Sequence, residues 1–88
     1  MIQLKAISSI FSIKAYPNPA HDFVNLHLNG VSSPKGKVFI IDLSGKVIKT
    51  QVITATDTKI DMAGLATGVY LLKYADGVHD ARFRIIKK

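Results

Sequence analysis

The chain has 88 residues, of which 48% are hydrophobic and only 20% charged, so we expect a single folded domain and not a disordered chain. Cysteine is absent, which excludes disulfides, thiolate metal sites and cysteine nucleophiles. The net charge of +6 permits binding to nucleic acid, anionic lipid or an acidic partner without selecting among them. The basic residues are dispersed and mostly alternate with apolar ones, which favours solvated strand faces over a dedicated anion site.

The N-terminal residues resemble a signal peptide only superficially, because Ser and Lys interrupt the apolar positions. We interpret residues 1–10 as an N-terminal linker or an expression remnant that leads into the first strand, and residues 11–88 as the domain. No apolar run in the sequence is long enough to span a membrane.

Alternating apolar and polar residues predict the first two strands. Phe11, Ile13 and Ala15 alternate with polar residues as far as Pro17, where two prolines flanking Asn18 predict a rigid, extended turn. Residues 24–28 alternate in the same way and predict a second strand with one wet face. The stretch from Asn29 to Gly36 then predicts the longest loop.

The middle of the chain predicts a hairpin and a short strand. Residues 38–43 are nearly all apolar, which predicts a strand covered on both faces. Ser44 and Gly45 predict a two-residue turn into a strand over residues 46–53. A polar bend is predicted over 54–58, a short strand at Ile60 and Met62, and a compact loop with at most one helical turn over 63–68.

The last part of the chain predicts a second hairpin. Residues 69–75 read as a strand, and Asp76 with Gly77 predicts a type I′ turn. The final strand runs from Val78 toward Lys88, with Phe83 on its apolar face and the arginines on the other. About seven short strands separated by turn signals predict an all-β, antiparallel sandwich.

The side chains that carry chemistry are few and scattered. His21 and His27 are roughly 20 Å apart on an extended chain, too far for one metal, and His79 beside Asp80 lacks any accompanying nucleophile. Asp57 and Asp61 lack the oxygen-rich loop of a calcium site. The sequence therefore predicts no catalytic residue, no metal site, no cofactor and no enzymatic activity.

Four motifs in order resemble the C-terminal sorting domain (type A) of the type IX, or Por, secretion system. The chain has Pro17-Asn18-Pro19 before an alternating strand, and a hydrophobic strand that ends in Asp-x-x-Gly-Lys, with Gly45 as the glycine. It then has L-x-x-G-x-Y, formed by Leu65, Gly68 and Tyr70, and a closing strand with a basic end. The motif residues, structural or recognised, are Pro17, Asn18, Pro19, Gly45, Leu65, Gly68, Tyr70 and Gly77.

This resemblance implies an immunoglobulin-like sandwich at the C-terminus of a larger secreted protein of Bacteroidetes-type bacteria. The implied partners are the outer-membrane type IX translocon or its shuttle protein, a sortase-like protease that removes the domain, and the parent cargo. The cargo would cross the periplasm and end at the cell surface or in the medium. Nucleic acid is not an expected partner.

The recognition determinant is expected in the last strand, where basic residues crowd together. The set is Arg82, Phe83, Arg84, Ile85, Ile86, Lys87 and Lys88. The strand is expected at a sheet edge, with Lys87 and Lys88 beyond the last cross-strand pair and untethered.

Two alternatives remain at this point. A non-catalytic adhesion or carbohydrate-binding module of a secreted enzyme would need exposed aromatic side chains, and Tyr70 and Tyr74 are the candidates. Because they share a strand face with Leu72, we expect them in the core or at its rim. A basic nucleic-acid binder would need a recognition helix or a stacking platform, and neither is evident.

Overall fold

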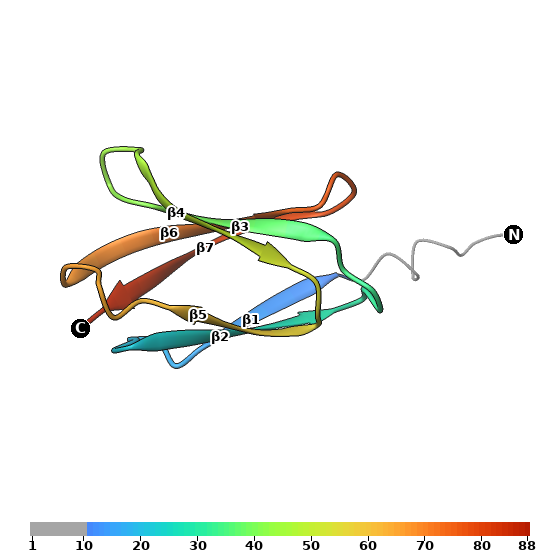
Figure 1. The fold of residues 1–88 in the computed structure, drawn as a ribbon, viewed down its shortest axis with the longest axis horizontal. Coiled ribbons are helices and arrows are strands. Elements are labelled where there is room, and N and C mark those ends of the chain that lie inside the picture. The colour runs from blue at the N-terminus through green and yellow to red at the C-terminus, as the bar shows by residue number, and fades with distance from the viewer. Residues whose placement is uncertain (1–10) are drawn as a thin grey trace, which may run out of the picture.

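The computed structural model describes residues 11–88, which form two β-sheets packed face to face (Figure 1). The strands are β1 (Ser12–Tyr16), β2 (Phe23–Asn29), β3 (Gly36–Ile41), β4 (Val47–Ile53), β5 (Asp57–Asp61), β6 (Gly68–Ala75) and β7 (Asp80–Lys87). One sheet has the order β1-β2-β5 and the other β4-β3-β6-β7, and every named strand pair is antiparallel. The predicted all-β sandwich of seven strands is confirmed. The linker predicted at 1–10 lies outside the described residues, and within residues 11–88 no helix could cross a membrane.

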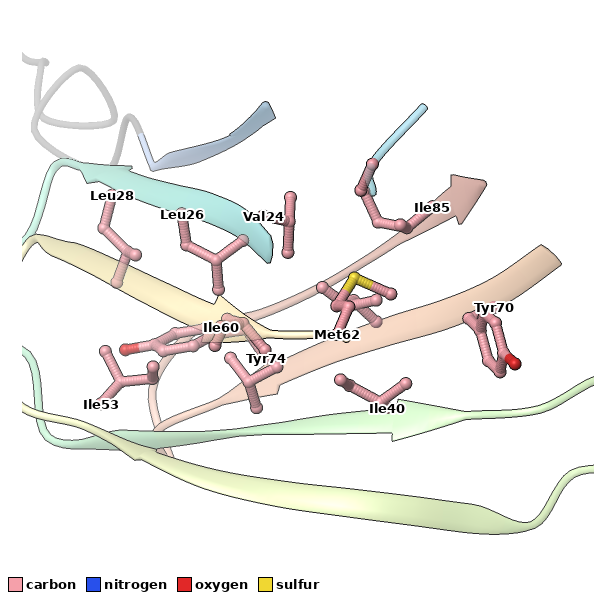
Figure 2. Close-up of a cluster of buried hydrophobic side chains, with 13 residues drawn as sticks. Val24, Leu26, Leu28, Ile40, Ile53, Ile60, Met62, Tyr70, Tyr74 and Ile85 are labelled. Atoms are coloured by element: carbon pink, nitrogen blue, oxygen red, sulfur yellow. The ribbon is translucent and has the colours of Figure 1, made fainter. Parts of the chain in front are cut away.

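The core lies between the two sheets and is built by the period-two alternation of the strands. Val24, Leu26 and Leu28 of β2 are at most 2% exposed, as the alternation predicts. From the other sheet Tyr74 and Ile85 are fully buried against the same cluster, which Figure 2 shows in the space between the layers. Burial of each large side chain contributes about 1.5–3 kcal/mol to the stability of the fold. Because the chain has no disulfides, this buried layer holds the two sheets together.

Both predicted hairpin turns differ from the expectation, for the same physical reason. The β3–β4 connection spans residues 42–46 and not two residues, because the Asp42 carboxylate accepts hydrogen bonds from Ser44 N (2.9 Å), Ser44 Oγ (2.6 Å) and Lys46 N (3.0 Å). In the β6–β7 hairpin Asp76 N donates to His79 O at 3.1 Å. Gly77 and Val78 are therefore the central residues, one position later than predicted. In each turn the aspartate carboxylate accepts backbone N–H groups in addition to the backbone hydrogen bonds that close the hairpin.

The region between β4 and β6 also departs from the prediction. Asp57 and Thr58, predicted in a bend, belong to β5, because β2 pairs with them through Leu26 and His27. Met62 follows β5 but is fully buried. Residues 63–67 form the compact loop that the sequence predicts, with Leu65 N donating to Met62 O at 3.1 Å and no helix.

The outer face of the four-stranded sheet contradicts the prediction that residues 38–43 are covered on both sides. Phe39 and Ile41 of β3 point away from the core and are half-buried, and no segment of the described chain lies over them (Figure 1). Their partial burial comes from neighbours in the same sheet. The apolar run therefore gives this sheet an apolar outer face and does not mark a third layer.

Candidate functional site

The last strand, β7, lies at the edge of the four-stranded sheet, as predicted. Its eight residues pair with β6 from Ala75↔Asp80 to Gly68↔Lys87. Ile85 is fully buried and Phe83 packs against the core, while Arg82, Arg84 and Ile86 are exposed on the outer face. The predicted division of β7 into an apolar inner face and a basic outer face is confirmed.

The connection between β1 and β2 fastens the second half of β7. Asn18 Nδ2 donates to Arg84 O at 3.2 Å, and Ile86 N donates to Asn18 Oδ1 at 3.1 Å. Ala20 N then donates to Ile86 O, and Lys88 N donates to Ala20 O, both at 2.7 Å. The outward backbone groups of this edge are therefore paired from Arg84 O onward, which leaves only the first half of the edge open.

The expectation that Lys87 and Lys88 extend freely past the sheet is wrong. Lys87 pairs with Gly68, forms a parallel bridge with Ala20 and is 9% exposed, and its Nζ donates to Lys88 O at 3.2 Å. The reason is long-range: Ala20 lies more than sixty positions earlier in the sequence and supplies the hydrogen-bond partners of the C-terminus. Nothing local to the basic tail indicates this contact.

Asn18 has a role that sequence reasoning did not assign. The sequence predicts only that Asn18 belongs to a turn fixed by its two flanking prolines, and both X–Pro bonds are cis. The structure shows in addition that the Asn18 amide acts as donor and acceptor to the backbone of β7. The only local signal is a short amide side chain in a segment whose prolines cannot themselves donate backbone hydrogen bonds.

The remaining motif residues are distributed over the fold and do not form one site. Gly45, Gly68 and Gly77 have φ values of 91°, 150° and 89°, in the region that favours glycine. Leu65 packs against the core, and Tyr70 is 7% exposed with its hydroxyl donating to Ala66 O at 2.5 Å. Their observed contacts are structural.

The electrostatics of β7 are set by unpaired cations. Both ion pairs within residues 11–88 have histidine as the cation, His27 with Asp57 at 2.7 Å and His79 with Asp76 at 3.1 Å. The guanidinium groups of Arg82 and Arg84 therefore have no carboxylate partner in the described part of the chain. An exposed edge strand with two such groups attracts an acidic ligand.

The polar cluster at the β6–β7 turn is structural. The Asp76 side chain is 8% exposed, and its carboxylate accepts hydrogen bonds from Tyr74 OH (2.8 Å), Val78 N (2.8 Å) and His79 N (2.5 Å). Burial opposes ionisation, but the hydrogen bonds outweigh it and hold the pKa of Asp76 well below its usual value. Burial and the Asp76 carboxylate together raise the pKa of Tyr74 to about 12. The His79 ring stacks on Phe11, with centroids 4.4 Å apart.

The other candidate chemistries have no geometric support. Tyr70 and Tyr74 are buried, so neither side chain is available to stack on a sugar or a base. The described residues contain no group of three or more His, Cys, Asp or Glu that could hold a metal ion. The candidate site is therefore the exposed outer face of β7.

Comparison with known proteins identified a matching family model and a solved structure of similar fold. The family model described as "Secretion system C-terminal sorting domain" matches residues 14–88. A solved structure of PorZ, a bacterial surface component of the type-IX secretion system of Porphyromonas gingivalis, is similar with a TM-score of 0.63 and 21% identity. The match covers 86% of this chain and 11% of the PorZ chain, so at this identity it supports the fold alone. The search of curated proteins found no match.

Proposed function

This chain belongs to the family of secretion system C-terminal sorting domains, and from that premise we propose that β7 is the surface that the machinery recognises. As a type IX sorting domain, it is a C-terminal signal for the export of a larger cargo and a non-catalytic tail of that cargo. Membership of this family implies contact with the secretion machinery and passage through the envelope to the cell surface or the medium.

The observation that carries the proposal is the exposed pair Arg82 and Arg84 on an edge strand whose inner face is anchored. Ile85 and Phe83 fix the strand to the core, and the Asn18 amide holds its far end. The backbone of the two arginines is thereby fixed, so both side chains leave the same face of the strand, which suits an ionic contact with an acidic receptor. Lys88 adds a third exposed cation at the end of the strand.

The finer steps of export are part of the same proposal. The cargo passes through the periplasm, the outer-membrane translocon or its shuttle protein binds the domain, and a sortase-like protease then removes it. Residues 11–88 act as the sorting domain, and residues 1–10 link it to the cargo.

The test is export of a reporter that carries this chain at its C-terminus behind a periplasmic signal peptide, in a bacterium with a type IX system. The double change R82E/R84E breaks no recorded side-chain hydrogen bond, so we expect the domain to fold while surface delivery falls about tenfold or more. The control, K14E/K59E, makes the same change in net charge on the other sheet and also removes the cation–π contact between Lys59 Nζ and the Phe23 ring (4.3 Å), so it is the more demanding test of folding. Normal export of the Arg82 and Arg84 variant, or an equal loss in the control, would contradict the proposal. Thermal unfolding of both variants separates lost recognition from lost folding.

Deletion of residues 86–88 is a poorer test than the charge reversals. The deletion removes the backbone partners of Ala20 and the pairing of Lys87 with Gly68. A loss of export would then have two causes, misfolding and lost recognition.

A further inference from the structure

The two sheets present outer faces of opposite character. On the three-stranded sheet the outward charges are balanced, with Lys14 and Lys59 against Asp57 and Asp61, and two aromatic side chains, Tyr16 and Phe23, lie among polar residues. On the four-stranded sheet the outward positions are apolar and basic. The register places Thr50, Phe39, Lys73 and Arg82 in one row and Val47, Ile41, Leu71 and Arg84 in the next.

The cations of this outer face have no partner within the described residues. Four of them, Lys37, Lys73, Arg82 and Arg84, stand against the single carboxylate of Asp80 on the outward positions of the sheet. Neither ion pair of the described chain involves them, and none of their side chains makes a recorded hydrogen bond there. On the opposite sheet the outward charges balance, so the uncompensated positive charge of this apolar face needs a separate explanation.

A shallow surface pocket of about 280 Å³ opens on the same face, where the β3–β4 turn meets β6. Its lining is mostly apolar, with Ile41, Leu43, Val69 and Leu71, and Arg84 stands at its wall. Asp42 also lines the pocket, but its carboxylate accepts hydrogen bonds from Ser44 and Lys46 N within the β3–β4 turn, so Arg84 is the charged group left to meet a ligand. Leu43 is 80% exposed, so the described chain does not fill the space. An apolar side chain with a carboxylate beside it matches this arrangement, because the pocket would take the apolar group and Arg84 the charge.

We propose that the outer face of the β4-β3-β6-β7 sheet docks on an acidic protein surface, with one apolar anchor of that partner seated in the pocket beside Arg84. The inference rests on the proposed function and extends it, since the receptor would read β3 and β6 together with β7 and not the C-terminal strand alone. A second copy of the chain is a poor occupant, because two such faces would bring like charges together. A nucleic acid is a poor one too, because an apolar strip separates the cations and only Phe39 offers an aromatic ring. A lipid surface is also a poor occupant, because binding to a bilayer does not require a pocket for one side chain.

The test uses two substitutions outside β7, each with a matched control. L71T removes the apolar centre of the face. F23T replaces an apolar side chain by threonine at a half-buried outward position of β2, the middle strand of the other sheet, and also removes the ring that Lys59 Nζ contacts. K73E reverses a charge on β6, and K14E changes the net charge equally on β1. Each variant is measured in the export assay with the full chain, and its melting temperature is recorded.

We expect L71T and K73E each to reduce surface delivery about tenfold, as loss of a central contact at an interface does, while F23T and K14E export normally. Normal export of L71T and K73E together with failure of R82E/R84E would overturn this inference and leave the proposed function standing. Normal export of all of these variants would overturn both.

Two further measurements exclude the other occupants. The purified chain is sedimented with vesicles containing anionic lipid, and its mass is measured over a range of protein concentrations. Lipid binding that L71T and K73E both abolish, or a dimer that L71T dissociates, would overturn the assignment to an acidic protein. A monomer without lipid binding, combined with the export losses, supports it. If L71T lowers the melting temperature by more than F23T does, its loss of export has misfolding as a second cause, and the comparison of K73E with K14E decides the test.

Discussion

The contact between Asn18 and β7 gives the sharpest test of how this domain holds its C-terminal strand. Asn18→Ala removes two hydrogen bonds, to Arg84 O and from Ile86 N, without touching the core. An intramolecular hydrogen bond contributes about 0.5–1.5 kcal/mol, so the free energy of unfolding is expected to fall by about 1–3 kcal/mol. In a domain of this size each kcal/mol lowers the melting temperature by about 4–8 °C.

Thermal unfolding followed by circular dichroism measures the global effect, and amide hydrogen exchange at Ile86 measures the local one. The matched control is Asn25→Ala, because Asn25 lies on the outer face of β2 and its side chain makes no recorded hydrogen bond. The Ile86 amide should exchange faster in the Asn18→Ala variant than in the original chain. In the control its exchange rate should be unchanged. An equal melting temperature for Asn18→Ala and the original chain, with normal protection of Ile86, would refute the role given to Asn18.

Two other predictions concern stability alone. The pKa of Asp76 is lowered by folding, so its ionised form stabilises the domain above the unfolded pKa of about 3.9, and this contribution is lost as the pH falls below that value. Asp76→Asn should therefore flatten the acid limb of a stability–pH curve and cost about 1–3 kcal/mol at pH 7; an unchanged acid limb would contradict this. Gly36→Ala should destabilise by about 1–3 kcal/mol, because a Cβ there would lie 2.8 Å from both Ala75 O and the Tyr74 ring. Denaturant unfolding measures the loss of stability. A Gly36→Ala variant as stable as the original chain would contradict this prediction, because it would show that β3 and β6 can move apart without cost.

The side-chain period of the chain was sufficient to predict the class of fold and most strands. Val24, Leu26 and Leu28 alternate with polar residues, and a half-buried strand is the arrangement that buries all three on one side. The same period placed Phe83 and Ile85 inward and the two arginines outward on β7. The family motifs, which depend on the order of short segments, were likewise readable without a structure.

Turn details and the strand β5 were less predictable. The carboxylates of Asp42 and Asp76 each accept hydrogen bonds from two or more nearby backbone N–H groups. These bonds shift each turn from the two residues that the sequence predicts for it. Asp57 and Thr58 look like a bend in sequence, and they extend because β2 supplies backbone partners across the sheet. In each case a specific hydrogen bond outweighs a weak local propensity.

The tertiary structure alone decided what surrounds the last strand. The order of the strands in the two sheets brings residues 18–20 beside β7, so Lys87 and Lys88 are paired and not free. It also leaves Phe39 and Ile41 without a covering layer, although their sequence is typical of a strand buried on both sides. Sequence periodicity reports which residues share a face of one strand. Which segment lies beside an edge, or over a face, depends on contacts between distant parts of the chain, and those carry no local pattern.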